Sequence, residues 1–347
     1  MSFTESIFEK LKRHPKRIVF PEGSHPNVIK AARMYADNQL GIPVLLGDKE
    51  RILKTAASLD ISLEFIRTID PAKSSEFPVF CERLKRLDRY RRLKLGAAED
   101  IMKNPCYFGA MMLQYGQVDG YVGGVEPQTG SIFRPLLKLV KPLPDAKTTG
   151  SCLIVELPRQ DIGHNGILFL AECGVLHEPD IEQIAAVGMQ TGLMARQLFG
   201  TRPRVAMISF STKGSVRTPS TEKMEAAVGV AKEWASKENM DIAVDGEMQI
   251  DVALVPAMAA AKMPKPSLVA GKANVLVFPE LNSASVAAKL IEHLVSSVVY
   301  GQLVIGLTRP AADVGREASP EKIVNMAAIV GLQSVEYRKL YPEKSAD

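Results

Sequence analysis

The feature that most constrains this chain is the alternation of short apolar runs with longer amphipathic segments. The apolar runs, most of which end in Gly, Pro or Ser, lie at residues 17–21, 42–47, 118–124, 152–158, 166–170, 204–211, 274–279 and 302–307. Helix-period segments lie at 26–39, 180–198, 220–237 and 283–298. Buried strands that alternate with amphipathic helices predict an α/β fold with largely parallel sheets.

The length of the chain suggests more than one domain. A chain of 347 residues corresponds to roughly two domains of ordinary size. The Pro-rich segment 141–147 is either the crossing between them or one exposed loop.

Composition narrows the class of protein. The 43 Lys and Arg residues against 39 Asp and Glu give a formal net charge of +4. This charge is too small and dispersed to indicate a nucleic-acid partner, but it is compatible with an anionic small substrate. No stretch approaches the ~18 apolar residues of a membrane span, and residues 1–17 lack the apolar core of a signal peptide. The four cysteines form no CxxC pair, so we expect reduced thiols in a cytoplasmic protein.

Polar side chains that follow the expected strands are the first candidates for a site, because ligands of parallel sheets bind beyond the carboxyl ends of the strands. Segment 209–215 offers hydroxyls and Lys213 after such a strand. These groups suit an anion, although the segment lacks the longer Gly-rich turn of a P-loop. The alternative is a polar loop or helix cap.

Two further segments combine a helix start with an arginine. Thr129 and Ser131 are possible caps, and Arg134 follows one turn later, where its guanidinium suits a phosphate or a surface ion pair. Ser319 and Pro320 predict the start of the last helix. Arg316 and Lys322 would then lie beside its N-terminus, which favours anions, or the segment is only a loop entering that helix.

The remaining polar patterns are weaker evidence for a functional site. The basic run 83–94 is either the solvated face of a helix or the source of an arginine that reaches a nucleotide phosphate. The five histidines form no HxxH or HExxH pattern, and no metal site is predicted. GxSxG and GxGxxG are absent from the sequence.

Seven segments taken together, in the same order and across nearly the whole chain, resemble the phosphate acetyltransferase family. They are residues 104–112, 118–124, 129–135, 171–175, 204–215, 245–251 and 270–279. The resemblance implies a transferase that converts acetyl-CoA and phosphate into acetyl phosphate and CoA, and the reverse. It also implies that CoA acts as a substrate and that no cofactor is tightly bound.

The resemblance further implies a homodimer of chains with two three-layer α/β domains and an active site in the cleft between them. In that architecture the last segment returns to the first domain. The first domain is therefore expected to comprise residues 1–147 and 298–347, and the second residues 148–297.

Residue roles carry over by position. The resemblance implies that Arg316 is the catalytic arginine, and that Arg134 and Arg92 help to bind CoA, with Arg91 as the rival of Arg92. Gly315 stands where the family has a serine, and Lys322 where it has the acidic base. The resemblance also places the substrate among the following residues: Thr129, Ser211, Lys213 and Ser285.

The change at Lys322 leaves the proton acceptor open. A lysine accepts a proton only when neutral, and burial or neighbouring positive charge would favour that form. Asp313, Glu317 and Glu321 are nearby alternatives. Three hypotheses follow: an active phosphate acyltransferase, a catalytically weak acyl-CoA-binding homologue with a sensor or regulatory role, or an enzyme for a different acyl group.

Overall fold

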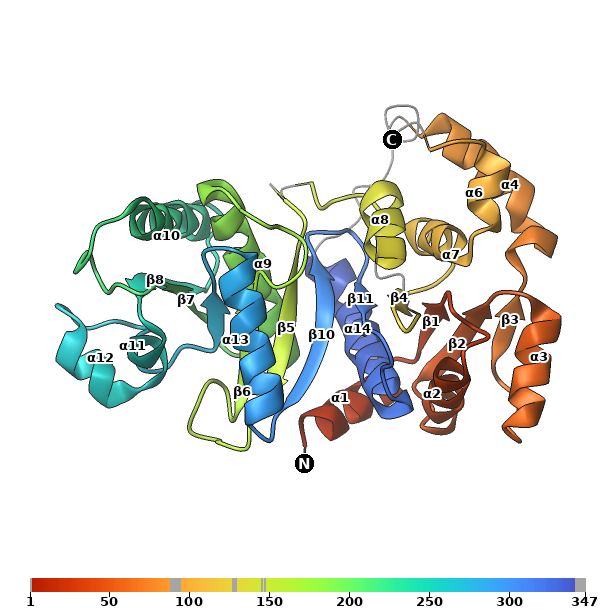
Figure 1. Ribbon diagram of the computed structural model, residues 1–347, viewed down its shortest axis with the longest axis horizontal. Coiled ribbons are helices and arrows are strands. Elements are labelled where there is room, and N and C mark those ends of the chain that lie inside the picture. Colours follow the sequence, from red (N-terminus) through yellow and green to blue (C-terminus); the bar gives the residue numbers. More distant parts are fainter. Residues whose placement is uncertain (1, 88–94, 127–129, 145, 147, 341–347) are drawn as a thin grey trace. The chain divides into compact units, whose positions relative to one another are not determined.

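The computed structural model describes residues 2–87, 95–126, 130–144, 146 and 148–340 (Figure 1). The chain divides into two compact units, one formed by Met1–Leu143 with Leu307–Asp347 and the other by Pro144–Gly306. The chain leaves the first unit within the Pro-rich segment 141–147. It returns to the first unit at Leu307, which is later than the expected boundary at 298. Strand β10 (Val298–Ile305) pairs with β5 (Gly150–Glu156), and this pairing keeps it in the second unit. That the two units are domains able to fold alone stays a prediction.

The first unit is built on a parallel sheet in the order β3-β2-β1-β4-β11. Its strands are β1 (Lys16–Phe20), β2 (Gly41–Leu46), β3 (Arg67–Ile69), β4 (Gly120–Gly123) and β11 (Ala311–Asp313). Its helices are α1 (Phe3–Lys12), α2 (Pro26–Asp37), α3 (Lys49–Ser58), η1 (Pro71–Lys73), α4 (Glu76–Arg86), α6 (Ala98–Lys103), α7 (Pro105–Gln114), α8 (Gly130–Leu139) and α14 (Pro320–Leu340). The segments at 17–21, 42–47 and 118–124 therefore hold strands, as predicted.

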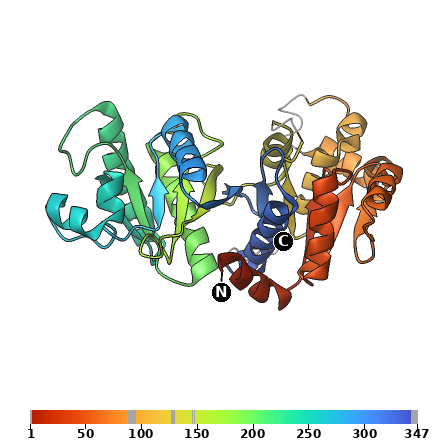
Figure 2. The ribbon, with the colours of Figure 1, turned by 60° about the horizontal axis from the view of Figure 1, so that its bottom comes forward.

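Helices cover both faces of this sheet. A β-carbon added at Gly120 would collide with Val330 of α14, whereas the next residue of β4, Tyr121, packs against Gly109 of α7. Because successive residues of a strand point to opposite faces, α14 and α7 lie on opposite sides. Helix α14 also packs against α1 and α2, as Figures 1 and 2 show. The first unit thus has three layers.

The second unit has a mixed sheet in the order β10-β5-β6-β9-β7-β8. Strands β10 and β5 pair antiparallel, as do β5 and β6, and the other pairs are parallel. Its remaining strands are β6 (Ile167–Ala171), β7 (Arg204–Ile208), β8 (Ala243–Met248) and β9 (Val275–Val277). Its helices are α9 (Ile181–Phe199), α10 (Pro219–Lys237), α11 (Ile250–Leu254), α12 (Pro256–Lys262) and α13 (Leu281–Leu294).

This second sheet is also covered on both faces. Leu170 and Leu276 share one apolar core with residues of α11 and α13. Met207 and Val277 instead face Gly188 of α9. The largely parallel three-layer α/β class predicted from the sequence is confirmed for both units.

Local signals fix the long helices. Asp180 and Gln183 form a reciprocal capping box at the start of α9, and Gly200 ends that helix in the left-handed conformation at φ 69°. The sequence predicted the helices at 26–39, 180–198 and 220–237 to within a few residues. The helix expected at 283–298 instead ends at Leu294, because the chain turns there to enter β10.

Candidate active site

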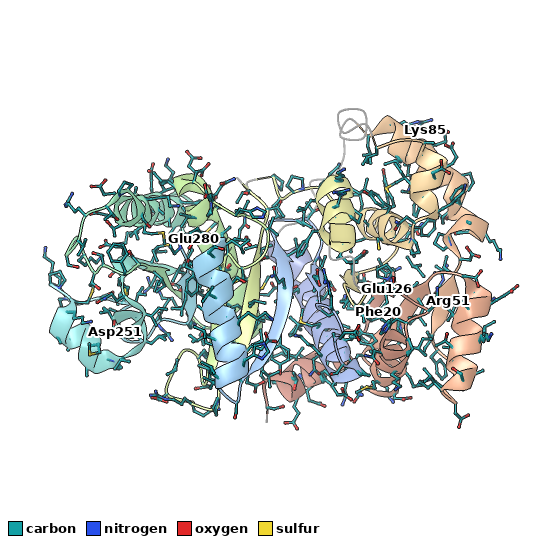
Figure 3. The ribbon with its side chains drawn as sticks, in the orientation of Figure 1. Phe20, Arg51, Lys85, Glu126, Asp251 and Glu280 are labelled. Atoms are coloured by element: carbon teal, nitrogen blue, oxygen red, sulfur yellow. The ribbon has the colours of Figure 1, made fainter. Side chains whose placement is uncertain are left out.

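The carboxyl ends of β1, β4 and β11 bring three loops of the first unit together. Figure 3 labels Phe20, the last residue of β1, and Glu126 on the loop after β4. The connection from β11 to α14 carries the predicted residues Gly315 and Arg316, and Lys322 lies in the first turn of α14. These neighbouring parallel strands deliver their loops to one edge of the sheet, where ligands of such sheets bind.

Glu22 ties the first two loops together. It lies two residues after β1 and is only 8% exposed. Its carboxylate accepts three successive backbone N–H groups, from Gly124 at 2.8 Å, Val125 at 3.2 Å and Glu126 at 3.0 Å. Such contacts stabilise an ionised carboxylate inside the protein and fix the path of the β4–α8 loop.

Asp313 ends β11 and is buried, with 3% of its surface exposed. Its Oδ1 accepts the Gly315 N–H at 2.8 Å. Burial raises the pKa of the Asp313 carboxyl to about 6, and the Glu22 carboxylate adds to the rise, while the Gly315 hydrogen bond and the charge of Lys322 oppose it. A side chain at Gly124 would collide with Asp313 Oδ1, so Gly124 touches both carboxylates.

The loop that carries Arg316 is anchored on both sides. Val314 donates its N–H to Gly123 O at 2.9 Å, and Glu317 donates to Val125 O at 3.3 Å. The Ala318 carbonyl accepts from Asn27 Nδ2 at 3.0 Å. Arg316 itself is exposed. Its backbone is therefore held in place while its guanidinium is accessible to an anion.

The start of α14 agrees with the sequence. Ser319 Oγ accepts the Lys322 N–H at 3.3 Å, and the helix begins at Pro320. This confirms Ser319 as the cap and Lys322 as the third helical residue. Lys322 is partly buried, and its charge acts on Asp313. The N-terminus of α14 thus combines the positive end of a 21-residue helix with two cationic side chains.

Arg134 lies on α8 in the same unit and is exposed. The charge of Arg134 affects two neighbouring groups. Burial raises the pKa of the Tyr107 phenol, and the charge of Arg134 opposes this rise. Burial also lowers the pKa of Lys138, and the charge of Arg134 lowers it further. A buried ion pair for Arg134 is thus not observed in the described part of the chain, and its accessible charge suits the predicted role.

In the second unit, the segment after β7 folds around a buried glutamate. Glu247 is 1% exposed, and its Oε1 accepts from Ser211 Oγ at 3.2 Å and from the Gly214 N–H at 2.7 Å. Ser211 is fully buried and also contacts Ser215 Oγ at 3.1 Å. The Ser211 hydroxyl therefore organises this loop from inside.

Lys213 and Ser285 differ in their surroundings. Lys213 Nζ contacts Asp245 Oδ1 at 2.6 Å and also donates to the Gly246 carbonyl. Burial opposes ionisation of Asp245, but hydrogen bonds from Lys213 and Ser267 outweigh it and lower the pKa of that carboxyl. The Lys213 ammonium thus already neutralises a protein carboxylate. Ser285 lies on α13 and is exposed.

Two of the predicted residues, Arg92 and Thr129, lie outside the described residues, as does the rival Arg91. The described ones fall into two groups, with Gly315, Arg316, Lys322 and Arg134 in the first unit and Ser211, Lys213 and Ser285 in the second. No group of three or more His, Cys, Asp or Glu side chains that could hold a metal is found in the described segments.

Sequence reasoning missed the organising role of Glu22 and Glu247. Glu22 follows the end of β1, and Glu247 is the second-last residue of β8. A polar residue at the carboxyl end of a strand was the available signal. What the sequence could not show is that each carboxylate points inward to backbone N–H groups.

Within the part of the chain that is described, no helix is both long and apolar enough to cross a membrane. The four cysteines are buried, and none of them is in a disulfide.

Comparison with known proteins gives a consistent result. Residues 2–331 match the family model described as "Phosphate acetyl/butaryl transferase". The phosphate acetyltransferase of Acetivibrio thermocellus is 37% identical over 96% of this chain and 98% of its own length. That of Thermoanaerobacterium thermosaccharolyticum is 38% identical over 96% of this chain and 100% of its own length.

Solved structures agree with this assignment. A phosphotransacetylase from Streptococcus pyogenes matches 97% of this chain and 100% of its own, with a TM-score of 0.87 and 30% identity. The EutD phosphotransacetylase from Staphylococcus aureus matches 95% of this chain and 99% of its own, with a TM-score of 0.85 and 29% identity. With the sequence match over residues 2–331, these likenesses show that the chain belongs to the phosphate acetyl/butyryl transferase family of transferases.

Proposed function

We propose that this chain is a phosphate acetyltransferase that interconverts acetyl-CoA plus phosphate and acetyl phosphate plus CoA. The observation that carries the proposal is the family match over residues 2–331, which includes the Arg316 loop at the start of α14. Acyl-CoA and phosphate or acyl phosphate are its substrates. CoA acts as a substrate, so the reaction needs no tightly bound cofactor.

Arg316 acts on the reacting group. When a thiolate attacks acetyl phosphate, negative charge develops on the carbonyl and phosphate oxygens. A guanidinium beside a helix N-terminus stabilises such charge without having to reorganise. The backbone contacts of the loop from 314 to 318 hold Arg316 for this task.

Four other candidates, Arg134, Arg92, Thr129 and Ser285, bind substrate. Arg134 and Arg92 are suited to the phosphates of CoA because a guanidinium donates two parallel hydrogen bonds to a phosphate. Thr129 and Ser285 supply hydroxyl contacts. Ser211 and Lys213 act through the shape of their loop, since Glu247 and Asp245 already hold their polar groups.

Turnover by the purified protein tests this function. Acetyl phosphate and CoA are mixed with the protein, and thioester formation is followed. We expect a rate of about 1–10³ s⁻¹, which is usual for enzymes. Protein that binds CoA but forms no thioester would instead be the acyl-CoA-binding homologue. A panel of longer acyl phosphates identifies the preferred acyl group.

The enzyme is a homodimer in this proposal. Val286, Leu290 and Leu294 follow one another at four-residue spacing on α13, and each is more than half exposed. An apolar stripe of this kind marks an interaction surface. The second copy of the chain is the proposed occupant. Four cysteines without a disulfide support a cytoplasmic location, where thiols remain reduced.

A further inference from the structure

The end of β11 holds a buried carboxyl group whose second oxygen has no protein partner. Asp313 Oδ1 accepts the Gly315 N–H at 2.8 Å. Asp313 Oδ2 is buried, and no hydrogen-bond partner for it is found among the described residues. An unpartnered buried acceptor costs free energy, so its presence calls for a reason. Protonation would remove the charge of the buried carboxyl, and with it the larger part of that cost.

Charged and titratable groups from three elements surround this carboxyl. Glu22 comes from the loop after β1, Tyr121 from β4 and Lys322 from α14. Burial, followed by Glu22, raises the pKa of Asp313 to about 6, against the Gly315 hydrogen bond and Lys322. An acid with this pKa is mostly ionised at neutral pH and still basic enough to accept a proton, which suits a general base.

Gly315, on the Arg316 loop, has open space beside it. A β-carbon added at Gly315 would meet no atom within 4 Å, and Gly315 is partly exposed. The same residue donates its N–H to Asp313. Gly315 thus leaves space on the Arg316 loop, at the residue whose N–H holds Asp313 Oδ1.

The other acids of this segment have different surroundings. Glu317 and Glu321 are both exposed. Hydrogen bonds from its own backbone and from Ser319 lower the pKa of Glu321, which makes it a weaker base. The charge of Lys322 opposes the rise of the Asp313 pKa. Asp313 is therefore the acid of the segment with both burial and an unused oxygen.

We propose that Asp313, and not the residue at position 322, takes the thiol proton of CoA in this chain. This inference rests on the proposed phosphate acetyltransferase activity. Asp313 supplies the base, and Glu22 is a positioning residue that acts on it from the β1 loop. Lys322 then balances the negative charge of the two carboxylates.

The proposed step balances. The S–H bond of CoA breaks and its proton moves to Asp313 Oδ2, which leaves a thiolate. The thiolate forms a C–S bond with the carbonyl carbon of acetyl phosphate. The bond between that carbon and the bridging oxygen breaks, and this oxygen leaves with the phosphate. The released phosphate then takes the proton from Asp313. The products are acetyl-CoA and hydrogen phosphate, and Asp313 is again ionised.

The variant Asp313→Asn tests the proposal in the full-length protein. We expect kcat/KM to fall by ~10²–10⁴, the usual effect of losing a general base. The wild-type limb of the pH–rate profile with an apparent pKa near 6 should disappear. The Kd for CoA, measured by calorimetry, should stay within about threefold. Asp313→Glu, which keeps the carboxyl, should regain part of the rate.

Matched variants separate this proposal from its rivals. Glu317→Gln and Glu321→Gln should keep the wild-type rate within about threefold and keep the acid limb. The proposal is overturned if the Asp313→Asn variant retains the wild-type kcat/KM or the acid limb of the pH–rate profile. It is also overturned by Lys322→Asp that is about tenfold faster than wild type, since position 322 would then be the place of the base.

The wild-type assay distinguishes this proposal from the proposed function. Wild-type protein that turns over, together with an active Asp313→Asn variant, contradicts the role of Asp313 alone. Wild-type protein without turnover contradicts both the activity and this role. Circular dichroism and thermal unfolding establish that each variant is folded before it is assayed.

Discussion

Arg316 and Lys322 place two cationic side chains at the N-terminus of α14, and Asp313 lies buried just before them. The positive end of a helix would favour an acid at position 322 rather than a lysine. The charge of the lysine instead acts on the Asp313 carboxyl, whose pKa is raised by burial and by the neighbouring Glu22 carboxylate. At the scale of the residue, the start of α14 thus combines the cationic side chains Arg316 and Lys322 with a buried carboxyl group, Asp313.

Replacement of Arg316 by Gln should remove charge stabilisation in the transition state. We expect kcat to fall by ~10²–10³, as when one preorganised donor is removed from an oxyanion site. The Kd for CoA should change little, because the group acts on the reacting oxygens. Steady-state kinetics and calorimetry measure the two effects. Arg159→Gln, at an exposed arginine, is the control and should behave as wild type. Equal losses in the two variants would contradict the role of Arg316.

Replacement of Asp313 by Asn should stabilise the protein at alkaline pH. The folded-state pKa of about 6 lies above the ordinary value of 3.8, so the folded protein favours the protonated acid. Its contribution to stability is present below pH 3.8 and is lost as the pH rises through about 6. Above that range the ionised acid costs up to ~3 kcal/mol, and Asn avoids this cost.

Thermal unfolding from pH 4 to pH 8 measures the effect. The Tm of Asp313→Asn should exceed that of wild type at pH 8, and the difference should shrink toward pH 4. Asp161→Asn, at an exposed aspartate, serves as the control. A variant that is less stable than wild type at pH 8, with no dependence on pH, would contradict the raised pKa.

Glu22 acts at the scale of elements, because its carboxylate joins the loop after β1 to the loop after β4. An amide in its place would offer one acceptor oxygen and turn an NH2 group toward backbone donors. Glu22→Gln should therefore lower the free energy of unfolding by ~1–3 kcal/mol. Urea unfolding measures the change, and Glu126→Gln, exposed on the same loop, is the control. Equal unfolding midpoints for Glu22→Gln and wild type would show that the three N–H contacts contribute nothing.

At the scale of the whole molecule, the exposed stripe on α13 predicts the oligomeric state. Leu290→Glu places a charge in the proposed apolar interface, where burial without a partner is costly. We expect wild type to sediment as a dimer and the variant to dissociate at micromolar concentration. The exposed neighbour Lys289→Gln is the control. Sedimentation velocity decides the matter, and a monomeric wild type would contradict the proposed dimer.

The sequence predicted much of the architecture because the relevant signals are local. Runs of apolar residues placed β1, β2, β5 and β7, helical periodicity placed α9, and the Ser319 cap placed the start of α14. It did not place the short strands β3 and β11, whose three residues each are too few for a clear pattern. The candidate site was predicted less completely. Arg316 was identified by resemblance, whereas the contacts of Glu22 connect distant segments of the chain.

The amino-acid sequence by itself determined the α/β class, the family and the cationic start of α14. Each depends on short segments and on their order along the chain, and not on contacts between them. Only the tertiary structure decided that β10 belongs with β5, because strand pairing depends on the order of strands in the sheet. Only the tertiary structure brought Glu22 to the loop beside Asp313 and buried both. The pKa of Asp313 follows from that burial and that neighbour, and neither is written in the local pattern.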